Sequence, residues 1–158
     1  MSGAPLRSTT SLVMTTMVDR IGELLLEKGM DGHDVVVSYA QSVNNRSYDD
    51  VYLADVQDWF SEVATMKAGR KSRNEEYRVV INIFCVRDNA QEATDAAIEH
   101  AATIEEWFAE EPSLGLNVEG LATLRVQETE MSVNVTYDDA QVWRSHVMMR
   151  PTVRSRLA

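Results

Sequence analysis

Hydrophobic positions follow a helical period near the start of the chain. Between residues 11 and 28, apolar side chains recur every three or four positions, at Val13, Met17, Ile21 and Leu24. This spacing places them on one face of an amphipathic helix. Hydroxyl side chains at residues 8–11 can cap the start of this helix, and Gly29 can close its end.

A second helical period follows a capping signal, either Asp88 with Gln91 or Asn89 with Glu92, and reaches about Glu110. Small alanines along its apolar stripe allow the backbone to sit close to a sheet. The predicted stripe consists of Ala93, Ala97, Ala101 and Ile104, with Trp107 and Phe108 at its base.

Alternating apolar and polar residues predict strands in the remaining segments. We expect a strand over residues 33–40, a bulged strand over 51–66 for which a helical face is the alternative, and a central strand over 77–86. Residues 41–50 are polar and are predicted to form an exposed loop. Residues 118–126, 131–137 and 142–149 predict a three-stranded meander, with Asp138 and Asp139 in its last turn.

The order of helix, strands, helix and strands predicts an α+β domain, with two main helices packed on a mostly antiparallel sheet. A chain of 158 residues corresponds to one domain, residues 1–158. We expect residues 1–10 and 151–158 to be flexible ends.

Composition narrows the function classes. The formal net charge is -10, which disfavours general binding to nucleic acids or anionic membranes. The single cysteine, Cys85, cannot form an internal disulfide. The sequence shows neither a pattern of a secretion signal nor an apolar run long enough to span a membrane. These features predict a protein that folds in the cytoplasm where it is made.

We find no pattern for catalysis, a cofactor or a metal, and so predict a protein that is not an enzyme. The histidines (His33, His100, His146) are scattered, and no phosphate-binding loop is present. Cys85 lies in the most apolar strand, where a thiol is inert. The tryptophans (Trp59, Trp107, Trp143) are interpreted as core residues, and His100 as a satisfied or half-exposed histidine. Adjacent carboxylates are interpreted as solvated faces, at residues 49–50, 75–76, 105–106, 110–111 and 138–139.

Charge is instead segregated along the chain. Acidic residues gather at Glu105, Glu106, Glu110 and Glu111, and basic residues gather in a predicted turn and near the chain end. The candidate contact residues in the turn are Lys67, Arg70, Lys71 and Arg73, those near the end are Arg150, Arg154 and Arg156, and those in the polar loop are Asn44, Asn45 and Arg46. One interpretation is a mixed surface with a frayed tail. The other is a set of complementary patches through which identical subunits meet head to tail in a ring.

Four segments resemble the tail terminator, or tail completion, proteins of long-tailed bacteriophages. They are the opening amphipathic helix, EEYRVVINIFCVRD at residues 75–88 leading into the alanine-rich helix, EEPSLGLNVEG at 110–120, and VWRSHVMMRPTVRSRLA at 142–158. The resemblance implies an α+β fold and a homohexameric ring without catalytic residues. Such a ring caps the tail tube, stops its polymerisation and meets the head connector. The long polar loop at residues 41–50 departs from the family pattern.

The resemblance also implies a virion protein at the neck-proximal end of the tail, assembled in the host cytoplasm. Its partners would be copies of itself, the tail tube protein and the head-tail connector protein, while DNA passes through without specific binding. Two alternatives stay open: a connector or stopper protein of the neck, and a small ligand-binding or enzymatic α+β domain.

Overall fold

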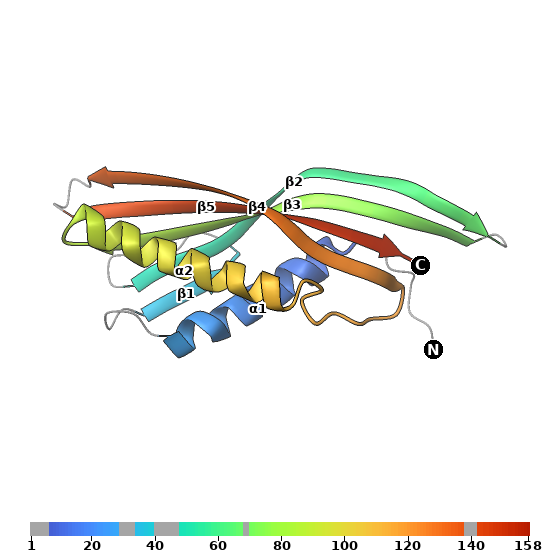
Figure 1. Cartoon of the computed structure of the whole chain (residues 1–158), viewed down its shortest axis with the longest axis horizontal. Coiled ribbons are helices and arrows are strands. Elements are labelled where there is room, and N and C mark those ends of the chain that lie inside the picture. The colour runs from blue at the N-terminus through green and yellow to red at the C-terminus, as the bar shows by residue number, and fades with distance from the viewer. Residues whose placement is uncertain (1–6, 29–33, 40–47, 68–69, 138–141) are drawn as a thin grey trace.

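The computed structural model describes residues 7–28, 34–39, 48–67, 70–137 and 142–158. These residues form two helices and a five-stranded sheet of order β1-β2-β3-β5-β4 (Figure 1). Only the pairing of β1 with β2 is parallel, which confirms the predicted α+β class with a mostly antiparallel sheet. The elements are α1 (Thr10–Lys28), β1 (Asp34–Ser38), β2 (Tyr48–Lys67), β3 (Arg70–Arg87), α2 (Ala90–Glu110), β4 (Leu121–Tyr137) and β5 (Trp143–Leu157).

The helix α2 begins at the second of the two predicted caps. The side chain of Asn89 accepts a hydrogen bond of 2.8 Å from the backbone N–H of Glu92. The predicted stripe of alanines with Ile104, Trp107 and Phe108 is buried, and α2 packs mainly on β5 and β3. The small side chains therefore serve the close helix-on-sheet packing that the sequence indicates.

The helix α1 packs beside α2 on the same face of the sheet (Figure 1). Its Val13, Met17, Ile21 and Leu25 join the core cluster that α2 and the strands share. Thr9 is fully buried and its carbonyl oxygen accepts from the N–H of Val13 at 2.8 Å. The predicted flexible end at residues 1–10 is therefore wrong at Thr9, while residues 1–6 and Gly29 lie outside the described part of the chain.

The strands β2 and β3 form a long hairpin, and the predicted bulges in β2 are confirmed. Register shifts occur between Leu53 and Asp55, between Gln57 and Phe60, and again between Val63 and Thr65. The strand starts earlier than predicted, because Tyr48 and both following aspartates already pair with β1. The predicted exposed loop over residues 41–50 is thus wrong at its end; residues 41–47 lie outside the described ranges.

The predicted three-stranded meander is wrong. A bulge between Gln127 and Glu130 lets one strand, β4, continue through both of the first two predicted strands. The third predicted strand does not end at Met149, because β5 runs to Leu157 between β3 and β4. Val153 and Leu157 are buried, so the prediction that residues 151–158 form a flexible end is also wrong. Residues 138–141, with the predicted aspartate turn, are outside the described ranges.

Candidate interaction surfaces

Arginines gather on the face of the sheet that is turned away from the helices. Along β5, the odd-numbered Val147, Met149 and Val153 face the core, so alternation places the even-numbered residues on the opposite face. Register then adds arginines from β3 and β4. The arginines of this open sheet face are Arg78, Arg125, Arg144, Arg150, Arg154 and Arg156.

Several of these arginines pair with acidic residues of neighbouring strands. Arg150 lies 2.7 Å from Glu130, which also binds Arg78 at 3.0 Å, and Arg154 lies 2.9 Å from Glu76. Exposed pairs of this kind contribute at most about 1 kcal/mol each. The arginines near the chain end are therefore held in place on a strand, which excludes the frayed-tail interpretation.

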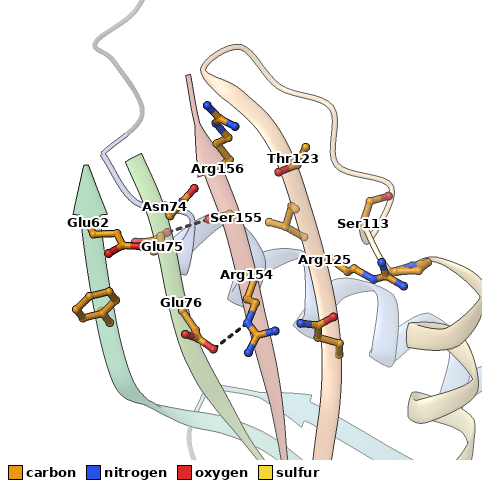
Figure 2. A pocket seen from close by; sticks show the side chains of 14 residues that line it. Glu62, Asn74, Glu75, Glu76, Ser113, Thr123, Arg125, Arg154, Ser155 and Arg156 are labelled. Carbon is orange, nitrogen blue, oxygen red and sulfur yellow. Dashed lines mark hydrogen bonds and ion pairs between the residues drawn. The ribbon is translucent and has the colours of Figure 1, made fainter. Parts of the chain in front are cut away.

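An open groove of about 950 Å³ crosses this face over β2, β3, β5 and β4. Charged side chains converge on it from all four strands, among them Glu62, Glu76, Arg125, Arg154 and Arg156 (Figure 2). The exposed ring of Phe60 adds an apolar wall. No sequence pattern predicted this groove or its ionisable lining.

Glu75 lies under the groove and anchors the start of α1. Its Oε1 accepts from the backbone N–H of Thr9 at 2.7 Å and from the Thr9 hydroxyl at 2.8 Å, and its Oε2 accepts from Trp59 Nε1 at 2.8 Å. Burial would raise the pKa of Glu75, but hydrogen bonds from Ser8, Thr9 and Trp59 outweigh it and lower the pKa. Glu75 is therefore a bound carboxylate with a positioning role rather than an acid poised for proton transfer.

Two sequence interpretations fail at this anchor. The pair at residues 75–76 is not a solvated face, because Glu75 is only 2% exposed. Trp59 is not a core residue, because 53% of its surface is exposed while its indole N–H is held by Glu75. Among the other tryptophans, Trp107 is buried as expected and Trp143 is half-buried.

A second buried network joins β2, β3 and α2. Both oxygens of Asp49 accept from Arg87, at 2.7 and 3.1 Å, and the Asp49 Oδ2 also lies 2.7 Å from His100 Nε2. Burial would raise the pKa of Asp49, but the bonds to His100 and Arg87 lower it to about 2. Asp49 and His100 are thus buried and paired, which corrects the solvated-face interpretation for residues 49–50 and the half-exposed alternative for His100.

This network does not fit a metal centre. Ligand atoms of Asp49, Cys85 and His100 lie within 4.8 Å of one another. However, the Asp49 carboxylate is already engaged twice by the Arg87 guanidinium, whose positive charge would repel a metal ion. Burial raises the pKa of the Cys85 thiol, so a metal-binding thiolate is disfavoured as well.

The surface of α2 carries the opposite charge to the arginines. Eight acidic and no basic residues occur between residues 88 and 111, and all eight are exposed: Asp88, Glu92, Asp95, Glu99, Glu105, Glu106, Glu110 and Glu111. No basic residue lies in the last turn of α2, where the helix dipole favours positive charge. The predicted acidic cluster therefore sits where it costs helix stability.

The predicted contact residues are brought together only in part. Arg154 and Arg156 meet in the groove, whereas the acidic cluster lies on the helix face and Arg150 lies outside the groove lining. The predicted basic turn is instead part of β3, which contains Arg70, Lys71 and Arg73. Arg73 pairs with Leu157, so its side chain lies on the opposite face of the sheet from Arg156. The side chains of Lys67, Arg70 and Lys71, and all of Asn44, Asn45 and Arg46, lie outside the described part of the chain.

Apart from Arg154 and Arg156, the groove lining was not predicted from the sequence, and the missed residues include the charged Glu62, Glu76 and Arg125. Their signal is strand register: Phe60 pairs with Glu76, Glu62 with Asn74, and Arg125 with Arg154. That register follows from the bulges and from the length of β5, and alternation alone does not give it. Continuing the alternation of β5 past Pro151 would have shown that Arg154 and Arg156 share a face.

Within the described ranges, no helix is long and apolar enough to cross a membrane. No protein-family model matches the chain, and no curated protein matches it.

Proposed function

We propose that this protein is a tail terminator of a long-tailed bacteriophage, whose copies form a ring that caps the tail tube. The ring stops polymerisation of the tube and offers its other side to the head connector. The observation that carries the proposal is an uneven distribution of charge: the exposed charged side chains of α2 are all acidic, whereas six arginines gather on the open sheet face, where three of them pair with Glu76 or Glu130. The family resemblance of the sequence supports the same function.

Charge separation of this kind favours contacts between unlike surfaces of identical subunits. A contact that joins two different patches is heterologous, and it closes into a ring when the rotation between neighbours divides a full turn. Complementary potentials also orient the subunits as they meet and disfavour contacts between like faces. A homohexamer is the stoichiometry that the resemblance implies.

The acidic end of α2 supports a role beyond stability. Glu106 and Glu110 lie in the last turns of the helix, next to the negative end of its dipole. Each such placement costs about 0.3–1 kcal/mol relative to a neutral side chain. Two functions could offset this loss of helix stability. The acidic side chains could bind a positively charged partner surface, or they could repel an anion.

The DNA path supplies such an anion. Duplex DNA carries one negative charge per about 1.7 Å, and binding to it depends on Lys and Arg contacts with phosphates. Residues 88–111, which contain α2, expose eight acidic side chains and include no lysine or arginine, so this surface repels a passing duplex. In the proposed ring, the acidic residues of this surface that do not contact a neighbouring subunit face the channel and let DNA pass without specific binding.

A small ligand-binding domain is the second candidate, and the groove is the observation that favours it. The groove is large enough for a small molecule. Its charged side chains, however, are largely engaged: Arg154 pairs with Glu76, and Glu75 is held by three neighbours. We therefore assign the groove to a contact with the tube or connector protein, as part of the terminator function.

The test is tube polymerisation in the presence of the protein. Purified tail tube protein is polymerised with increasing amounts of this chain, and tube lengths are measured by negative-stain electron microscopy. We expect shorter tubes with a ring of extra density at one end. Tubes of unchanged length without terminal density would overturn the proposal. Binding to the portal side of heads, with no effect on tubes, would instead identify a connector or stopper.

A further inference from the structure

One edge of the sheet is left open by β4. Residues 130–137 of β4 pair regularly with β5, from Glu130 with Arg150 to Tyr137 with Trp143. On the outer side of these eight residues, no described residue forms a backbone hydrogen bond with them. The row of N–H and C=O groups along this edge is a template for another strand.

This edge lacks the features that normally protect one. It contains no proline, no lysine, and a single charged residue, Glu130, and its pairing is free of bulges. Met131, Val133 and Tyr137 are each more than 40% exposed along it. An exposed, regular and apolar edge of this kind leads to aggregation unless a partner covers it.

The free part of β2 shows the contrast. Beyond Tyr52 it has no neighbour among the described residues on its outer side, and it too exposes aromatic side chains. However, three register shifts break its regularity, and Asp55, Asp58 and Glu62 place charges along it. Bulges and charges are the devices that prevent edge pairing, so β2 is protected where β4 is not.

The same molecule offers a matching edge on the other side of the sheet. Following the register across β5, β3 and β2 places β1 in the same half of the sheet as residues 130–137 of β4, at the opposite edge. Within the described ranges, no strand pairs with the outer side of β1, and its valines are half-buried. Among the described strands, β1 and β4 are therefore the two edges of this half of the sheet.

Strand direction also matches. The pairings show that β1, β2 and β5 run in one direction, whereas β3 and β4 run in the opposite direction. A second copy in the same orientation would thus present its β4 antiparallel to β1 of the first. Antiparallel pairing gives the better hydrogen-bond geometry of the two arrangements.

We infer that residues 130–137 of β4 pair with β1 of a second copy of this chain, so that the sheet continues from one subunit to the next. The contact joins two different edges and therefore leads from copy to copy around a ring. The inference rests on the proposed ring and specifies its interface. Exposed apolar side chains at both edges, Met131 and Val133 on β4 and Tyr39 beside β1, become covered in the contact.

The first experiment places charge on the proposed interface strand. The double variant Met131→Lys with Val133→Lys should dissociate into monomers. In sedimentation velocity, the protein concentration at which half of the chains are assembled should rise at least tenfold. The matched control is Val63→Lys, at a valine on the protected part of β2 that is 54% exposed compared with 44% for Val133, and it should leave assembly unchanged. Thermal melting of each variant verifies that the subunit is folded.

The second experiment identifies the neighbour. Val36→Cys and Asn134→Cys are made in separate chains, and both positions lie on the open sheet face because they share register with Asp50 and His146. The chains are mixed and treated with a short bismaleimide. A crosslinked dimer that forms in the mixture, and in neither variant alone, supports pairing of β1 with β4.

Each remaining outcome contradicts the inference in a specific way. Crosslinked dimers of Asn134→Cys alone would indicate a twofold contact between two β4 strands. Crosslinks from Asn134→Cys to tube protein, and none to Val36→Cys, would assign the edge to the tube. If the double lysine variant still forms rings, the proposed interface is wrong but the terminator function is unaffected. If the unmodified protein forms rings through this interface that do not shorten tubes, the terminator function is wrong but the interface is unaffected.

Discussion

Asp49 and Arg87 form a bidentate ion pair inside the protein, with hydrogen bonds of 2.7 and 3.1 Å and the Asp49 side chain fully buried. The pair ties the start of β2 to the end of β3, and His100 connects it to α2. The network therefore joins three elements that are far apart in sequence. Its removal affects the whole fold and not one strand.

Replacing Asp49 tests this directly. Asp49→Asn keeps the shape but leaves the Arg87 charge buried without its counter-ion, which is expected to cost about 3–5 kcal/mol of unfolding free energy. Asp55→Asn, on the exposed part of β2, is the control and should change stability by less than about 0.5 kcal/mol. Urea unfolding measures both. Equal stabilities of the two variants would show that the pair is dispensable.

Acid should weaken the same network. The folded-state pKa of Asp49 is lowered to about 2 from the ordinary aspartate value of 3.8, so its stabilising contribution is present above the ordinary value and is lost as the pH falls towards 2. Glu75 acts in the same direction, because its folded-state pKa is also lowered. Carbon-detected NMR of the Asp49 carboxyl should give a midpoint near 2. A midpoint near that of a solvated aspartate would contradict the structure.

The end of β5 should be essential for stability. Leu157 is buried and its Cα pairs with both Arg73 and Leu121, so Leu157→Ala is expected to cost about 2–5 kcal/mol. The neighbouring Arg156→Ala removes an exposed side chain and should cost about 0.5 kcal/mol or less. Chemical denaturation compares the two. If Leu157→Ala were as stable as Arg156→Ala, the last strand would be poorly packed.

Neutralising the acidic end of α2 should separate stability from assembly. Glu106→Gln with Glu110→Gln is expected to raise the unfolding free energy by about 0.6–2 kcal/mol, because two unfavourable charges leave the helix C-terminus. The same variant should assemble less well, because in the proposed ring it removes acidic side chains that face a cationic surface of a neighbouring subunit.

Glu92→Gln, in the first turn of the same helix, is the control. There the acidic side chain is favourable, so the substitution should lower stability slightly. Differential scanning calorimetry and sedimentation velocity measure the two effects. A fall in stability in both variants would show that the dipole does not control this helix.

Local patterns were sufficient for the helices and for the central strand. The cap at Asn89, the alanine stripe of α2 and the apolar run of β3 are properties of neighbouring residues, and sequence spacing expresses them fully. The bulges of β2 were also visible as a mixture of two periods around Val56 and Trp59. These elements were predicted because their causes are local.

The buried charges and the groove could not be predicted in this way. Asp49 and Glu75 each stand next to another acidic residue, which in sequence indicates a solvated face. Their partners are dozens of positions away: Arg87 and His100 for Asp49, and Thr9 for Glu75. Burial of an acidic residue depends on such distant partners, and so does the register that brings Arg154 beside Glu76.

The order of the strands has a consequence for folding. β4 is held in the sheet only by β5 among the described strands, although β4 precedes β5 in sequence. The pair of β4 and β5 therefore joins the rest of the sheet only through the contact of β5 with β3, and the formation of this non-local contact slows folding. In native-state hydrogen exchange, any opening that releases β5 releases β4 with it, so the amides of these two strands should exchange as one cooperative unit.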